Sequence, residues 1–284
     1  MPRVGVRASR QEPSAFDVHT LRVPSDGSFR LSDVDPGATP GAPGGKEETR
    51  AASASLNDEL SALQERLWAE DRRSMLVVLQ AMDAGGKDGA IKKVFTGLNP
   101  QGVEVTSFKA PSEDELAHDY LWRIHKRTPP RGTIGIFNRS HYEDVLVVRV
   151  NGWIDEDEWR RRYEQIRAFE SLLASQGARI VKFMLHISKE EQAQRLQARL
   201  DRPDKRWKFR RGDLDDRARW DDFMGAFDDA LRETSTDDAP WYVIPADKKW
   251  YRDWAILRVL VDVVREMDPQ FPEPEEGLSD VVVR

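Results

Sequence analysis

The sequence contains no cysteine. This absence excludes disulfides, thiolate zinc sites and cysteine nucleophiles, and it fits a reducing compartment such as the cytoplasm. The five histidines are not paired at a spacing typical of a zinc site. No apolar run approaches the length of a membrane span, and the N-terminus has no apolar segment of the signal-peptide kind. We therefore expect a soluble, cytoplasmic protein that binds no membrane.

An excess of positive charge is also missing, because the formal net charge is -6. This balance argues against a general nucleic-acid binder, so we expect no nucleic-acid partner. A chain of 284 residues can form one large core, or one core with an arm. Residues 1–52 are rich in proline, glycine, serine and charge. We interpret them as a partly flexible arm that wraps the domain or stays mobile, and residues 53–284 as the domain itself.

Strand-like and helix-like segments alternate after the arm, as they do in βαβ units. Helical spacing of apolar residues predicts a helix from Leu56 onward. The other expected helices span residues 90–98, 113–127, 156–175, 189–200, 215–233 and 253–266, and the expected strands span 75–79, 103–107, 133–137, 180–187 and 241–245. We predict an α/β fold with a mainly parallel five-stranded sheet, helices on both faces, and ligands beyond the carboxyl ends of the strands.

A glycine-rich turn follows the first expected strand. Its candidate phosphate-binding residues are Ala84, Gly85, Gly86, Lys87, Asp88 and Gly89. Glycines let backbone N–H groups close around phosphate oxygens, and the helix end and the lysine add positive charge. The turn departs from the standard P-loop pattern, because Ala81 stands in place of the first glycine and Asp88 in place of Ser or Thr. The alternative is a glycine-rich turn with a solvated lysine.

Asp83 lies within this anion-binding turn, where its carboxylate would repel phosphate unless a cation lay between them. A magnesium ion would resolve the conflict. Lys92 and Lys93 follow by one helical turn. They either extend the positive surface for a long phosphate chain or simply face water.

A second polar cluster follows the third expected strand. Arg139 could neutralise charge on a transferring phosphoryl group, while Asn138 and Asp144 could hold a metal ion and its waters. The alternative is a helix start, which Glu143 and Asp144 would favour for electrostatic reasons alone.

A dense block of cations between residues 195 and 213 interrupts the alternation. Positive charge beside Pro203 and Gly212 suggests a mobile lid that closes over a polyanion. The alternative is a solvated helix-loop-helix with acidic partners. Trp207 and Phe209 in this block either stack on a base or pack against the domain.

Together these segments resemble the polyphosphate kinase 2 family, and its class III branch in particular. The resemblance spans roughly residues 29–266, and four ordered motifs carry it, at residues 80–89, 137–145, 203–209 and 239–247. It implies a P-loop kinase fold with a helical lid at about residues 195–220. It also implies phosphoryl transfer between inorganic polyphosphate and adenine nucleotides, with AMP and ADP forming ADP and ATP. Magnesium is the implied metal, with manganese as an alternative, and a homo-oligomer is the implied assembly.

The resemblance also assigns roles to individual residues. Asp83 and Lys87 match the Walker A acid and lysine of the family, and Arg139 matches its Walker B arginine, so these three are the expected catalytic residues. Lid residues that look like phosphate contacts are Arg195, Arg199 and Lys208.

Asn138 departs from the aspartate that is common in other branches, and looks like the class III form. Asp144 would then be the remaining metal-binding acid beside Asp83, and Glu143 would help to admit AMP.

Two other classes of function fit the same features. One is an ATP-dependent P-loop nucleoside or nucleotide kinase, which would use ATP in place of polyphosphate as donor. The other is a non-catalytic sensor of polyphosphate or nucleotides, which would bind without turnover. An acid that faces phosphate argues against pure binding, because binding alone does not need Asp83 there.

Overall fold

A computed structural model describes residues 17–278 and 281–283 of the chain. Its strands are β1 Ser74–Gln80, β2 Val103–Ser107, β3 Ile134–Asn138, β4 Ala178–His186 and β5 Trp241–Pro245. They form one sheet in the order β2-β3-β1-β4-β5, and every pairing is parallel. The expected five-stranded α/β fold is therefore confirmed. β1 is buried along its whole length, as its unbroken apolar run predicts for a central parallel strand.

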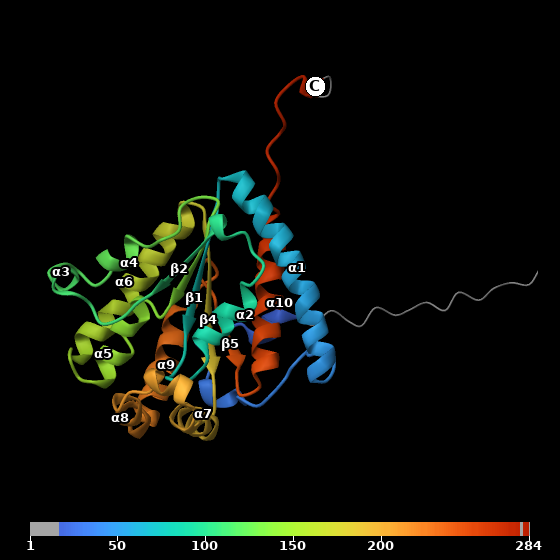
Figure 1. The fold of residues 1–284 in the computed structure, drawn as a ribbon. Helices are drawn as coiled ribbons and strands as arrows, with labels where there is room; N and C mark the ends of the chain where they lie inside the picture. The colour runs from blue at the N-terminus through green and yellow to red at the C-terminus, as the bar shows by residue number, and fades with distance from the viewer. Residues whose placement is uncertain (1–16, 279–280, 284) are drawn as a thin grey trace, which may run out of the picture.

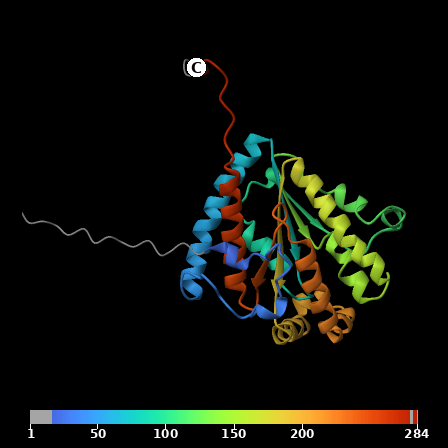
Figure 2. The ribbon, with the colours of Figure 1, turned by 180° about the vertical axis from the view of Figure 1, so that it is seen from behind.

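Helices cover both faces of the sheet (Figures 1 and 2). One face carries α1 Lys46–Glu70, α2 Lys87–Val94 and α10 Lys249–Met267, and the other carries α6 Glu156–Ser175 and α9 Trp220–Thr234. Shorter helices are α3 Glu113–Leu116, α4 Trp122–His125 and α5 Val147–Val150. Short 3₁₀ helices before the cation-rich block are η1 Val18–Leu21, η2 Leu31–Asp33, η3 Pro100–Gly102 and η4 His141–Asp144. None of the described helices is both long and apolar enough to span a membrane.

The cation-rich block forms α7 Lys189–Asp201, the 3₁₀ helix η5 Pro203–Lys208 and α8 Gly212–Ala218. Figure 1 shows the arrows of β4 and β5 pointing toward α7 and α8. The block therefore lies at the carboxyl edge of the sheet, where ligands were expected.

Two expected helices are each divided into two. The prediction of a single helix at 113–127 was wrong. The Asp119 carboxylate accepts hydrogen bonds from the N–H groups of Leu121 and Trp122, at 3.0 and 3.1 Å, and so starts a separate helical turn. The helix predicted at 215–233 is interrupted at Arg219, whose backbone angles leave the helical region. Helix α5 was not expected at all, because so short an apolar segment carries no periodic signal.

The N-terminal arm packs on the domain where the structure describes it. Val18, Leu21, Val23 and Leu31 are buried in the core. Val23 N–H donates to the carbonyl of Trp241 in β5 at 2.8 Å. Helix α1 already begins at Lys46, so the expected boundary after residue 52 falls inside a helix. Residues 1–16 of the predicted arm lie outside the described part of the chain.

Candidate active site

The register of the sheet brings the glycine loop and the second polar cluster together. Leu79 near the end of β1 lies beside Asn138 at the end of β3, and the Arg139 N–H donates to the Leu79 carbonyl at 3.1 Å. Arg139 has a φ of 64°. A non-glycine residue in this left-handed region is strained, and such strain is often stored at functional sites. Its guanidinium group donates to the Asp83 carboxylate at 3.0 Å. Two of the three expected catalytic residues are thus in direct contact.

The loop can be built only with glycine at two positions. Gly86 has a φ of 105°, and a Cβ there would lie 2.2 Å from Arg252 Nη1. A Cβ at Gly85 would lie 2.5 Å from the Ala81 side chain and 2.8 Å from the Met82 carbonyl oxygen. The tight turn delivers the chain directly into α2, whose N-terminus is a favourable site for an anion.

Lys87, the third expected catalytic residue, is buried behind this turn. Its Nζ donates to the Ala81 carbonyl at 2.7 Å. Burial and the nearby positive charge of Arg139 lower the pKa of Lys87 to about 8, although neighbouring carboxylates oppose the shift. The lysine still carries its charge at neutral pH, where it can attract phosphate.

Asp88 connects two other predicted phosphate-site residues, Asn138 and Lys208. Its carboxylate accepts hydrogen bonds from Asn138 Nδ2 at 2.9 Å and from Lys208 Nζ at 3.0 Å. Burial opposes ionisation here, yet these two hydrogen bonds outweigh it and hold the pKa of Asp88 below its ordinary value. The loop, the end of β3 and the lid therefore meet at one carboxylate.

The expected metal ligands do not meet in this way. Asp144 accepts a hydrogen bond from Arg162 of α6 at 3.2 Å, and burial raises the pKa of Asp144 to about 6 against the opposing charge of Arg162. Asp83 is paired with Arg139 instead. Burial likewise raises the pKa of Glu143, although Arg139 and Lys87 oppose it.

No three acidic or histidine side chains converge as a complete ligand set within residues 17–278 and 281–283. A magnesium ion usually takes one or two protein carboxylates and completes its shell with waters and substrate phosphates. Arg139 binds only Oδ1 of Asp83, which leaves Oδ2 without a hydrogen-bond partner among the described residues. Asp83 therefore fits a metal site that the phosphates themselves complete.

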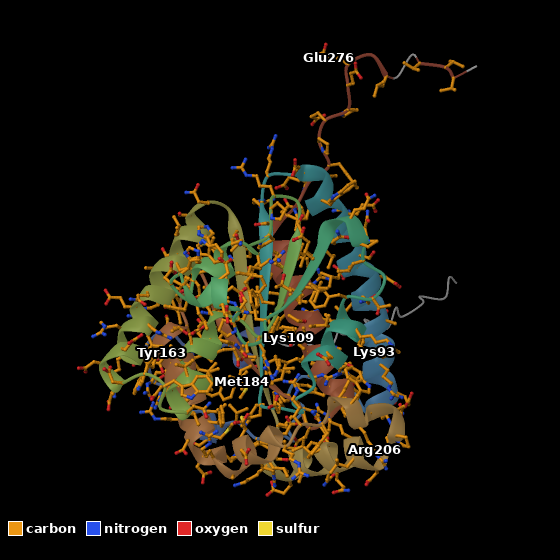
Figure 3. All side chains as sticks on the ribbon, turned by 60° about the vertical axis from the view of Figure 1, so that its left-hand side comes forward. Lys93, Lys109, Tyr163, Met184, Arg206 and Glu276 are labelled. Carbon is orange, nitrogen blue, oxygen red and sulfur yellow. The ribbon has the colours of Figure 1, made fainter. Side chains whose placement is uncertain are left out.

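The lid residues differ in how they face the loop. Arg195 is buried and donates to the carbonyls of Ala84 and Gly85 at 3.2 and 3.0 Å, so it lies behind the loop. Arg199 donates to the Lys208 carbonyl and to Asp213. Lys92 and Lys93 are exposed in the last turn of α2. In the view of Figure 3, Lys93 and Arg206 of the lid lie on the same side of the molecule.

Three residues that were not predicted lie close to the site: Asp213 and Asp216 face Asp83, and Arg252 lies behind the loop. Burial and the negative charge of Asp83 raise the pKa of both Asp213 and Asp216 in α8. Their i,i+3 spacing is a usable signal, because it places both on one helix face. Arg252 of α10 donates to the Gly86 carbonyl at 3.3 Å. Nothing in its local sequence distinguishes it from an ordinary helix residue.

Comparison with known proteins identifies the family. The model of Polyphosphate kinase 2 (PPK2) matches residues 44–272. The AMP/ADP-polyphosphate phosphotransferase of Meiothermus ruber is 55% identical over 262 residues, which cover 92% of this chain and 98% of that protein. The ADP-polyphosphate phosphotransferase of Rhodopseudomonas palustris is 46% identical over 228 residues, which cover 76% of this chain and 79% of that protein.

A solved structure agrees with these matches. The crystal structure of Polyphosphate Kinase 2 from Arthrobacter aurescens TC1 superposes with a TM-score of 0.89 at 48% identity, and the match covers 92% of this chain and 93% of that one. Phosphotransferases of this kind generally need a divalent metal ion. The chain therefore belongs to the polyphosphate kinase 2 family of phosphotransferases.

Proposed function

We propose that this chain transfers phosphoryl groups between inorganic polyphosphate and the adenine nucleotides AMP and ADP, forming ADP and ATP, at the glycine loop. The single observation that carries the proposal is the meeting of Asp83, Lys87 and Arg139 at that loop. The Meiothermus ruber relative is named for transfer between polyphosphate and both AMP and ADP, and the Rhodopseudomonas palustris relative for ADP, which supports the proposal.

Repulsion between two phosphate-bearing substrates is the main barrier that such a protein must lower. Lys87 and Arg139 place two positive charges at the end of the loop. Lys87 is hydrogen-bonded to the Ala81 carbonyl and Arg139 to the Asp83 carboxylate. Both groups can exchange these partners for phosphate oxygens, which would align donor and acceptor. The acceptor phosphate oxygen is already a nucleophile, so no covalent intermediate and no general base are needed.

We assign magnesium, with manganese as an alternative, to Asp83, and we keep Asp144 as a candidate second carboxylate. A bound divalent ion would neutralise charge on the phosphates and fix their line of approach. Chelation with EDTA should abolish turnover, and added magnesium should restore it. Turnover that persists in excess EDTA would contradict this assignment.

The lid is proposed to contact the phosphate chain through Arg199 and Lys208, with Lys92 and Lys93 extending the positive surface. Arg195 also donates to the carbonyls of Ala246 and Asp247, at 2.6 and 3.1 Å. A residue fixed to the loop and to the end of β5 cannot swing freely. We therefore place the moving part of the lid after Arg195, in η5 and α8.

Acceptor choice and assembly are two further parts of the proposal. Glu143 is assigned to AMP acceptance, so Glu143→Ala should lower the rate with AMP more than the rate with ADP. An equal loss with both acceptors would contradict this role. We also propose a homo-oligomer, which sedimentation of the purified protein tests, because a monomer at micromolar concentration would exclude it.

A donor assay tests the proposed function. The purified protein is given AMP, polyphosphate and magnesium without ATP, and the formation of ADP and ATP is followed by chromatography. The proposal predicts both products. Activity with an ATP donor but none with polyphosphate would favour an ordinary nucleotide kinase, and binding without turnover would favour a sensor.

A further inference from the structure

Two buried arginines lie directly behind the glycine loop. Arg195 of α7 donates to the carbonyls of Ala84 and Gly85, and Arg252 of α10 donates to the carbonyl of Gly86. The Arg252 side chain is only 3% exposed. The carbonyl groups of three consecutive loop residues are thus bound by two guanidinium groups from elements far apart in the sequence.

Gly86 makes room for the Arg252 guanidinium group. A Cβ at Gly86 would lie 2.2 Å from Arg252 Nη1 and 3.4 Å from Arg195 Nη1. At Gly89 a Cβ would make only ordinary contact with Arg252, at 3.5 Å from Nη2, so the close approach is confined to Gly86. Gly86 is therefore favoured by its own positive φ, and any larger residue there would push the Arg252 guanidinium out of its place.

Each arginine has its own acidic partner. Arg252 forms an ion pair with Asp253 at 2.6 Å, and Arg195 forms one with Glu191 at 2.7 Å. Because these charges are already balanced, the arginines contribute little net positive charge to a ligand. What they supply is a rigid fork of N–H donors aimed at the carbonyls.

Fixing the carbonyls also fixes the N–H groups. In a trans peptide the C=O and the following N–H point in opposite directions. The bound carbonyls of Gly85 and Gly86 therefore turn the N–H groups of Gly86 and Lys87 away from the arginines. Neither of these N–H groups has a hydrogen-bond partner in the part of the chain that the structure describes. They remain available for an anion at the start of α2.

We infer that Arg252, acting with Arg195, is a positioning residue that holds the loop in the shape that leaves its N–H groups available to an anion. The inference rests on the proposed function only in taking a phosphate chain as the ligand. Its physical content is preorganisation: the N–H donors are already oriented, so phosphate binding does not have to order them.

Arg252→Met tests this role, because it removes the donors and keeps much of the volume. Arg258→Met is the matched control, since Arg258 lies on the same helix and pairs with Asp262 at 3.1 Å, away from the loop. The probe is inorganic tripolyphosphate, whose affinity is measured by calorimetry without nucleotide. Loss of a hydrogen bond from a charged donor should weaken binding about tenfold in Arg252→Met. The control should bind as the unmodified protein does.

Amide hydrogen exchange distinguishes positioning from general destabilisation. The Gly85 and Ala90 amides are hydrogen-bonded within the loop region, to the carbonyls of Met82 and Gly86. In ligand-free Arg252→Met they should exchange faster, while the amides of β1 keep their protection. Arg252→Lys keeps a charged hydrogen-bond donor and should show smaller changes in both tripolyphosphate affinity and amide exchange. If Arg252→Met does not fold, this lysine variant provides the test instead.

Two results would overturn the inference. One is unchanged tripolyphosphate affinity in Arg252→Met, and the other is a loss of protection in β1 as large as that in the loop. Neither measurement depends on turnover. Failure of the polyphosphate donor assay would therefore remove the proposed function and leave this test intact.

Discussion

Arg139 donates a hydrogen bond to the carboxylate of Asp83 across 3.0 Å, although the two residues are 56 positions apart. The cation and the acid that are expected to face the phosphates are therefore paired with each other in this structure. Such a pair keeps both side chains in place at the loop without leaving either charge unbalanced. Phosphate and a metal ion can then replace each partner in turn.

Replacing Arg139 should impair transfer more than binding. In Arg139→Lys the positive charge remains, but the planar fork that can hold two phosphate oxygens is lost. We expect kcat to fall on the order of 10²-fold with a smaller change in KM, because removal of a charge-stabilising donor has effects of that size. Steady-state kinetics with polyphosphate and AMP provide the measurement. A rise in KM at constant kcat would show that Arg139 only binds substrate.

The lowered pKa of Lys87 predicts a pH limit for the free enzyme. With a pKa of about 8, the amine is charged below that pH and neutral above it. The affinity for polyphosphate, and with it kcat/KM, should fall as pH rises through about 8. Lys46→Met, which removes an exposed lysine at the start of α1, should leave the profile unchanged. A kcat/KM that stays level up to pH 10 would contradict the account of Lys87.

Asp144 should lower stability at neutral pH while it serves activity. Burial raises its pKa from 3.8 to about 6, so the folded state holds this proton more tightly than the unfolded state does. The tighter proton binding adds to the free energy of unfolding in full below about pH 4, and this addition is lost as pH rises through about 6. Asp144→Asn should therefore stabilise the metal-free protein by about 3 kcal/mol at pH 8, in urea unfolding, with little change at pH 4.

The same variant should lose activity if Asp144 binds the metal. A protein that is more stable but less active would support both statements. Lower stability of Asp144→Asn at pH 8 would show that the pair with Arg162 outweighs the burial of the carboxylate.

The contact between Lys208 and Asp88 should affect substrate binding and leave stability nearly unchanged. Their side chains are 35% and 67% exposed, and ion pairs so accessible to water contribute about 0–1 kcal/mol. Lys208→Met should raise the KM for polyphosphate severalfold, and the effect should shrink as salt screens the charge. A drop in melting temperature with unchanged KM would indicate a structural contact instead.

Local patterns were sufficient for the sheet and for the loop chemistry. The buried strand at 74–80 and the glycines after it have a distinctive sequence, and the parallel register then brings Asp83 and Arg139 together. The roles of the arginines were less predictable. A cation-rich segment has the same composition whether its donors face a ligand or backbone carbonyls, so Arg195 could not be placed behind the loop from sequence.

Contacts between distant elements left no local signal at all. Arg252 binds a carbonyl 166 positions away, and only the packing of α10 against α2 brings them together. The break at Asp119 was also hidden, because a capping aspartate within a polar segment looks like any other exposed acid. Tertiary packing and side-chain capping, rather than periodicity, decided these features.

The most direct test of the account is the turnover of purified Lys87→Met and Asp83→Asn with polyphosphate, AMP and magnesium, after circular dichroism has shown that both are folded. The account predicts that each variant loses transfer by about 10²-fold or more, because each removes a charge that acts on the phosphates in the transition state. Near-normal formation of ADP and ATP by either folded variant would contradict it.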